Sequence, residues 1–326
     1  MSNTIIKTDG LTKQFGKFIA VNNINMKVTQ GSIHGFVGPN GAGKTTTIKM
    51  LIGAYQKTSG TGSIAGHSMG SIESRQKIGY APEKSEFYPQ MTAIEYLVYN
   101  GKLAGLTEEN AITKAFELLD LFEMTPFAYK KPIKFSSGMK KKITLAQALI
   151  NDPEILILDE PTANLDPESR MFIIEILRQF VKEKNLTVLI SSHILTELEL
   201  IVDEVTLINQ GQIVLNGKIE EIKNRFNQGV FDISTSDNKK LSKQLDLLNW
   251  IDRVVRTDNV VKVFTKEPDR LKQQISHILL DLNLMLLMFN EEKITLDNIY
   301  KSVFKKGDQQ ESINNEEINE VSEVTE

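Results

Sequence analysis

The chain has 326 residues, of which 40% are hydrophobic and 25% are charged, and it contains no cysteine. This length favours about two domains, and the composition excludes collagen-like, disulfide-scaffold and wholly disordered proteins. The net charge is −4, but residues 307–326 alone hold seven acidic side chains and no Lys or Arg. The remainder is near neutral, which argues against a dedicated nucleic-acid binder, so we expect no nucleic-acid partner.

Three regions follow one another along the chain. Residues 1–226 alternate short β-branched runs with longer helical patterns, as an α/β domain does. Residues 227–306 form a second unit, and residues 307–326 are polar and acidic, which predicts a disordered tail. No run approaches the roughly 18 apolar residues of a membrane span, and residues 1–11 lack the apolar stretch of a secretion signal.

The first motif follows a short predicted strand, residues 33–37, and opens a helix at Thr46. It matches the phosphate-binding pattern G-x-x-x-x-G-K-[ST] at every fixed position. Glycines allow backbone N–H groups to curl around phosphate oxygens, and the helix N-terminus adds its dipole. We therefore expect Lys44 on the β- and γ-phosphates and Thr45 on Mg²⁺. The nucleotide-binding residues expected here are Gly38, Pro39, Asn40, Gly41, Ala42, Gly43, Lys44, Thr45 and Thr46.

A second motif ends a predicted buried strand. Four apolar residues, 155–158, run directly into Asp159 and Glu160. Alone this pattern is a common strand ending, but downstream of a phosphate loop it predicts a metal ligand and a base. We expect Asp159 to hold Mg²⁺ through water and Glu160 to polarise the attacking water.

The interval between the two motifs leaves room for an inserted, mostly helical subdomain at about residues 84–145. Thr92 and Glu95 predict a capping box at the start of a helix over residues 93–99. A second helix is predicted over residues 140–149, and its lysines 140–142 are interpreted as a solvated face rather than a phosphate clamp.

The second unit shows alternating strand and helix patterns in a readable order. The order βαββαβ is that of a ferredoxin-like fold, a small α+β domain. The predicted elements are a strand at 230–234, a helix at 241–248, a hairpin of strands 253–256 and 260–265, a helix at 268–280, a strand at 284–289 and a final helix at 296–304.

The most specific pattern is Phe135-Ser136-Ser137-Gly138-Met139, just before the helix at 140–149. At this point the chain resembles the ATP-binding subunits of ABC transporters, over about residues 5–217, and the pattern resembles their LSGGQ signature. The resemblance implies that Ser136 and Gly138 present donors to the γ-phosphate bound by the opposite subunit. Met139 is similar to an export-type variant, whereas Ser137 replaces a glycine and is expected to crowd the phosphate or alter turnover.

The same resemblance assigns further positions. Residues 163–166 resemble the D-loop, which places Asp166 against the partner subunit. Residues 191–193 resemble the switch loop, which implies that His193 contacts the γ-phosphate. Glu83 resembles the Q-loop position, where it would accept a metal-bound water. Phe15 resembles the aromatic that stacks on adenine, with Phe18 as the alternative.

The resemblance also implies a fold and a function. It implies an ABC-type P-loop NTPase domain with the inserted helical subdomain, followed by the α+β domain. ATP and Mg²⁺ are the implied cofactors. The implied role is that of the ATP-hydrolysing subunit of an exporter, peripheral on the cytoplasmic face of the cell membrane. Two copies would sandwich two ATP molecules and drive a separate transmembrane permease.

Two alternatives stay open at this point. One is an ABC-type ATPase acting on DNA, ribosomes or a regulatory complex. Such proteins usually carry paired nucleotide domains, long coiled-coil insertions or strong basic patches, and none is visible in this sequence. The other is an ATP-binding regulator with weak hydrolysis, which Ser137 motivates.

Overall fold

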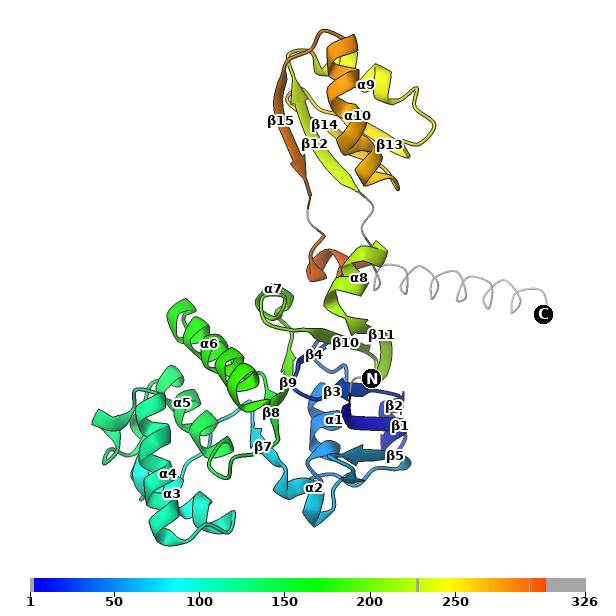
Figure 1. Cartoon of the computed structure of the whole chain (residues 1–326). Helices are drawn as coiled ribbons and strands as arrows, with labels where there is room; N and C mark the ends of the chain where they lie inside the picture. Colours follow the sequence, from blue (N-terminus) through cyan, green and yellow to red (C-terminus); the bar gives the residue numbers. More distant parts are fainter. Residues whose placement is uncertain (1–2, 227–228, 293, 303–326) are drawn as a thin grey trace, which may run out of the picture. The chain divides into compact units, whose positions relative to one another are not determined.

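The structure is a computed structural model that describes residues 3–226, 229–292 and 294–302. The chain divides into two compact units, Met1–Ile219 and Glu220–Glu326 (Figure 1). We expected the boundary after residue 226, whereas the division falls within the start of α8 (Ile219–Phe226). The tail predicted at residues 307–326 lies outside the described residues.

A mostly parallel sheet forms the centre of the first unit. Its strand order is β11-β10-β4-β9-β8-β7, and β11 alone among these strands runs antiparallel to its neighbour. Strands β4, β8 and β9 are buried along their whole length, in agreement with their mostly apolar sequences. The strands are β4 (Ile33–Val37), β7 (Ile78–Ala81), β8 (Ile155–Asp159), β9 (Thr187–Ser192), β10 (Glu204–Asn209) and β11 (Gln212–Lys218).

An antiparallel sheet packs on the other side of α1 (Lys44–Leu51). One core cluster contains Ile48 of α1 together with Leu11 of the antiparallel sheet and Ile157 of the parallel sheet. Burial of these apolar side chains therefore holds α1 between the two sheets. The antiparallel strands are β1 (Thr4–Phe15), β2 (Phe18–Ile24), β3 (Lys27–Thr29), β5 (Ser59–Ile64) and β6 (His67–Ser68).

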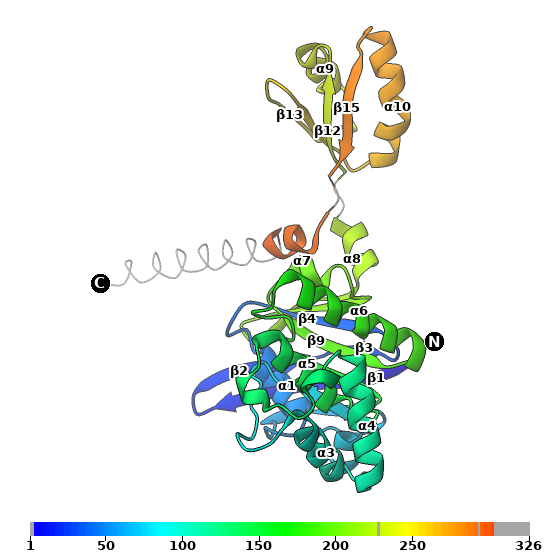
Figure 2. The same cartoon turned by 90° about the vertical axis from the view of Figure 1, so that its left-hand side faces the viewer.

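The inserted subdomain contains two short 3₁₀ helices, Thr125–Phe127 and Pro132–Lys134, and three α-helices that lie side by side in Figures 1 and 2. They are α3 (Ala93–Leu103), α4 (Glu108–Leu121) and α5 (Ser137–Ala148). Helix α3 begins with the predicted capping box, in which Thr92 and Glu95 exchange hydrogen bonds. Helix α5 packs against β7 and so connects this subdomain to the central sheet.

Further α-helices of the first unit are α2 (Ile72–Gln76), α6 (Pro167–Lys184) and α7 (Leu195–Leu198). In the part of the chain that the structure describes, no helix is long and apolar enough to cross a bilayer.

The second unit has the predicted order βαββαβ. Its sheet order is β13-β14-β12-β15 with every pair antiparallel, as a ferredoxin-like fold requires. Both helices pack on one core that includes Phe231, Leu241 and Leu271. Residues 296–302 are helical, and the rest of the predicted final helix lies outside the described residues. The elements are β12 (Val230–Thr235), α9 (Asn238–Leu245), β13 (Arg253–Arg256), β14 (Val261–Phe264), α10 (Pro268–Asp281) and β15 (Leu286–Glu291).

Candidate active site

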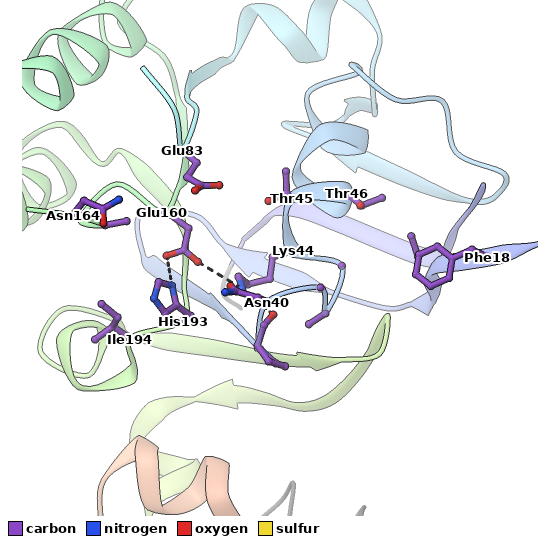
Figure 3. A pocket seen from close by; sticks show the side chains of 16 residues that line it. Phe18, Asn40, Lys44, Thr45, Thr46, Glu83, Glu160, Asn164, His193 and Ile194 are labelled. Carbon is purple, nitrogen blue, oxygen red and sulfur yellow. Dashed lines mark hydrogen bonds and ion pairs between the residues drawn. The ribbon is translucent and has the colours of Figure 1, made fainter. Parts of the chain in front are cut away.

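A cavity of about 590 Å³ opens at the carboxyl edge of the central sheet (Figure 3). Its walls come from the loops that follow β4, β7, β8 and β9, from the first turn of α1 and from two residues of β2. This edge is where parallel α/β sheets bind ligands. The lining residues are Phe18, Ala20, Pro39, Asn40, Gly41, Ala42, Gly43, Lys44, Thr45, Thr46, Glu83, Glu160, Ala163, Asn164, His193 and Ile194.

The loop between β4 and α1 is shaped for close backbone approach. Gly43, the N-cap of α1, has φ +104°, and a Cβ atom there would lie 2.6 Å from the carbonyl oxygen of Ala20. A Cβ atom on Gly38 would lie 2.2 Å from the carbonyl oxygen of Ile208. No side chain caps α1, and its first turn holds no acidic residue. The N-terminal N–H groups of α1 can therefore bind an anion.

Lys44 brings a positive charge to this loop although its side chain is buried. Its Nζ donates hydrogen bonds to the carbonyl oxygens of Gly38 (2.7 Å) and Pro39 (3.2 Å). The same Nζ lies 3.6 Å from the Glu160 carboxylate. Gly38 does not line the cavity, but its carbonyl oxygen helps to position the Lys44 side chain.

Glu160 lines the cavity directly after β8, between Lys44 and His193 (Figure 3). It is 8% exposed, and its φ of +49° is a strained value for a side chain of this kind. One carboxylate oxygen faces Lys44, and the other lies 2.9 Å from Nδ1 of His193. Partners on both sides therefore orient this carboxylate, as a general base requires.

Asp159 lies one residue earlier and is buried behind the cavity wall, which it does not line. Its carboxylate accepts a 2.6 Å hydrogen bond from the Ser191 hydroxyl, which in turn accepts a 3.1 Å bond from the Glu160 N–H. One serine thus links both acids. We had placed Ser191 only in a loop pattern, although its position at the end of a buried strand was a usable signal.

Glu83 follows β7, the strand that pairs with β8, and lines the cavity. In Figure 3 its carboxylate and the Thr45 hydroxyl point toward the same space. Tyr80 lies in the preceding strand, where burial raises the pKa of its hydroxyl to about 12, and the carboxylates of Asp159 and Glu83 add to the increase.

Lys141 overturns the prediction of a solvated lysine face. It is 7% exposed, and its Nζ donates to the carbonyl oxygens of Glu83 (2.6 Å), Glu160 (3.2 Å) and Pro82 (3.4 Å). Burial lowers the pKa of its ammonium group. The signal that we missed is helical spacing, because Lys141 lies on the same buried side of α5 as Gly138 and Leu145.

The two candidate aromatic residues have different surroundings. Phe18 lines the cavity and is 65% exposed. Phe15 is not among the lining residues and instead packs edge-on against Tyr55, with the Lys13 ammonium 4.8 Å from its ring centre. The structure therefore brings Phe18, rather than Phe15, to the phosphate loop.

Three further predicted residues do not line this chain's cavity. Ser136 caps α5, and Gly138 lies buried in the first turn of that helix. Asp166 caps α6 by accepting a 2.9 Å hydrogen bond from the Ser169 N–H, and this bond holds the pKa of the carboxyl below its usual range. Ser136 and Gly138 of the signature segment therefore lie outside the nucleotide cavity of their own chain.

Ser137 connects the signature segment to the nucleotide cavity. Its hydroxyl donates a 3.3 Å hydrogen bond to the carbonyl oxygen of Asn164, which lines the cavity. Asn164, Ala163 and Ile194 are lining residues that we had not assigned as site residues. Asn164 and Ala163 lie in the D-loop-like segment, and Ile194 follows His193, so adjacency in sequence was the available signal.

The sequence and the fold of this chain are similar to those of known proteins. A family model described as ABC transporter matches residues 21–163. The bacitracin transport ATP-binding protein BcrA of Bacillus licheniformis is 39% identical over 270 residues, which cover 81% of this chain and 86% of BcrA. The chain belongs to the ATP-binding subunits of ABC transporters.

Other ABC subunits agree with this assignment. The linearmycin resistance ATP-binding protein LnrL of Bacillus subtilis is 37% identical over 68% of this chain and 71% of its own length. A solved ATP-binding subunit of an ABC transporter superposes with a TM-score of 0.63 at 28% identity, over 68% of this chain and 93% of that one.

The family assignment confirms the predicted fold and activity. This ABC subunit binds and hydrolyses ATP as part of an exporter that has a separate transmembrane permease. The similar proteins named above support neither an ABC-type ATPase acting on DNA, ribosomes or a regulatory complex nor an ATP-binding regulator with weak hydrolysis.

Proposed function

We propose that the cavity binds Mg²⁺-ATP and that Glu160 is the general base of its hydrolysis. The observation that carries the proposal is the position of the Glu160 carboxylate between Lys44 and His193, beside a glycine loop at a helix N-terminus. The triphosphate would lie on the loop N–H groups, with Lys44 on the β- and γ-phosphates. Glu160 would take the proton of the attacking water, and His193 would hold Glu160 and contact the γ-phosphate.

The oxygen donors of the cavity fit Mg²⁺. Thr45 offers a hydroxyl and Glu83 a carboxylate that point toward the same space in Figure 3. The Asp159 carboxylate does not line the cavity and accepts a hydrogen bond from Ser191. Proteins usually hold Mg²⁺ with one or two carboxylates together with substrate phosphates and water. When bound, the ion would offset the negative charge of the phosphates.

The adenine ring is assigned to Phe18. A flat aromatic side chain is needed for stacking, and Phe18 lines the cavity with an exposed ring. Phe15, which we expected in this role, is engaged with Tyr55 and Lys13.

A second copy of the chain is the proposed partner of the cavity. Ser136, Gly138 and Asp166 lie outside it, so they are available to complete the ATP site of another subunit. The N-terminus of α5, where Ser136 and Gly138 lie, suits the γ-phosphate charge. We further propose that the dimer works on the cytoplasmic face of the cell membrane with its permease.

The substitution Glu160→Gln tests the assignment of the base. The variant should bind ATP with nearly unchanged affinity but lose hydrolysis by about 100-fold or more, because a general base contributes at least that factor. Phosphate release measures turnover, and a fluorescent ATP analogue measures binding. Lys44→Ala is the matched variant that should lose both. Hydrolysis at the wild-type rate by Glu160→Gln would contradict the assignment.

The same variant tests the proposed dimer. Bound ATP persists in Glu160→Gln, so light scattering should show the 36.7 kDa mass doubling when Mg²⁺-ATP is added. Lys44→Ala should remain a monomer under the same conditions. A Glu160→Gln variant that binds ATP and stays monomeric would rule out the proposed assembly for the isolated subunit.

A further inference from the structure

We propose that Lys141 is a positioning residue for ATP hydrolysis, which holds the loops carrying Glu83 and Glu160 in fixed relation across the cavity. The inference rests on the proposed roles of these two acids. Lys141 itself lines no part of the cavity, so it acts through the backbone of both loops.

The contacts of Lys141 join segments that are distant in sequence. Its Nζ reaches 2.6 Å to the carbonyl oxygen of Glu83, after β7, and 3.2 Å to that of Glu160, after β8. A third carbonyl oxygen, that of Pro82, lies at 3.4 Å. Strands β7 and β8 are parallel neighbours, so the ammonium group connects two adjacent loops at the edge of the sheet where the cavity opens.

The chemistry of a buried ammonium group makes these bonds strong. An ammonium group has three donors, and in this structure three carbonyl oxygens accept from it. Burial removes competing water, which strengthens charge-assisted hydrogen bonds and makes their loss costly. Lys141 therefore ties down two loops that have no strand pairing of their own at these positions.

The loop after β8 needs such support. Glu160 has a left-handed backbone conformation, which persists only where its surroundings enforce it. Its N–H is held by Ser191 and its carbonyl oxygen by Lys141. The same carbonyl oxygen also accepts a 3.3 Å hydrogen bond from the Ala163 N–H. Lys141 thus supplies one of several restraints on the peptide groups that aim the catalytic carboxylate.

Lys141 lies on α5, the helix that begins within the signature segment, residues 135–139. It therefore links this segment to the loops after β7 and β8. The helix begins directly at Ser137, with Ser136 as its cap. A movement of α5 that displaces Lys141 would carry the ammonium group away from the carbonyl oxygens of Glu83 and Glu160. The orientation of the signature helix and the placement of both acids are therefore mechanically coupled.

Lys141→Met removes the donors and the charge at similar side-chain length. We expect kcat to fall by about tenfold or more, because this is the effect of losing a charge-assisted hydrogen bond. The dissociation constant for ATP should change by less than about threefold. Hydrogen exchange followed by mass spectrometry should show faster exchange in peptides that cover residues 82–84 and 160–163. Lys140→Met, the same change one residue earlier on a half-buried side chain, should alter none of these values.

Lys141→Arg keeps the charge and several donors, so it should retain more activity than Lys141→Met. If Lys141→Met lowers the thermal midpoint, kcat is compared with Lys141→Gln, which keeps a donor, at a temperature where both are folded. Wild-type exchange in both loops, or a loss of kcat matched by equal losses in ATP binding, would overturn the proposal. If Glu160→Gln were to hydrolyse ATP normally, the base assignment would fail, whereas the exchange result would still report on Lys141.

Discussion

At the scale of single residues, several residues that line the nucleotide cavity have positive φ angles, among them Gly43 and Glu160. Gly43 adopts +104° at the N-cap of α1, and Glu160 adopts +49° after β8. Glycine meets such a requirement without strain, whereas Glu160 needs the hydrogen bonds of Ser191 and Lys141. The shape of the cavity therefore depends on backbone conformations that few other residue types could adopt.

The substitution Gly43→Ala tests whether the backbone conformation of the phosphate loop requires glycine at this position. A Cβ atom there would lie 2.6 Å from the Ala20 carbonyl oxygen in addition to the strained φ. Gly41 is the matched control, because it has a φ of +81° but nothing within 4 Å of an added Cβ. Without nucleotide, Gly43→Ala should lower the free energy of unfolding by about 1–3 kcal/mol more than Gly41→Ala. Urea titration with circular dichroism measures this, and equal effects would refute the steric argument.

At the scale of elements, the start of α3 has a charge-dependent cap. The backbone N–H and the hydroxyl of Thr92 donate to the Glu95 carboxylate and hold the pKa of that group below its usual range. A lowered pKa means that the ionised carboxylate stabilises the fold above its unfolded-state pKa. This stabilisation is lost as the pH falls through the folded-state pKa.

Thr92→Ala should therefore have a pH-dependent effect. At neutral pH it should lower the thermal midpoint by roughly 2–4 °C, as expected for the loss of an N-cap. The difference from wild type should shrink as the pH falls through the folded-state pKa of Glu95. Thr107→Ala removes the cap of α4, where the third helical residue is Asn110, and should show no such shrinkage. Parallel pH profiles for both variants would contradict the prediction.

At the scale of the whole molecule, each compact unit has a hydrophobic core of its own. The core of the first unit surrounds α1, and the core of the second includes Trp250, the only tryptophan of the chain. Trp250 is 8% exposed and lies under the guanidinium group of Arg270, at 4.8 Å. Its fluorescence therefore reports on the second unit alone.

Nucleotide should stabilise the first unit without stabilising the second. In Glu160→Gln, Mg²⁺-ATP at about 100 times its dissociation constant should add about 2.7 kcal/mol to the unit that binds it. Circular dichroism should then show a raised midpoint, while the Trp250 fluorescence transition stays in place. Lys44→Ala should show neither change. A Trp250 transition that shifts together with the dichroism would indicate that the two units unfold as one.

The sequence by itself determined the features that depend on contiguous residues. The phosphate loop, the Asp159-Glu160 strand ending and the α3 capping box each lie within one short segment, where local conformation decides the chemistry. The βαββαβ order of the second unit was likewise readable because its strands and helices have distinct periodicities.

Only the tertiary structure decided which distant residues meet. The register of β8 against β9 pairs Asp159 with Ser191, which creates the serine bridge between the two acids. The packing of α5 against β7 buries Lys141 beneath two loops, although its charge predicted solvent exposure. Such contacts depend on strand register and helix packing, which bring together segments that the local sequence pattern cannot pair.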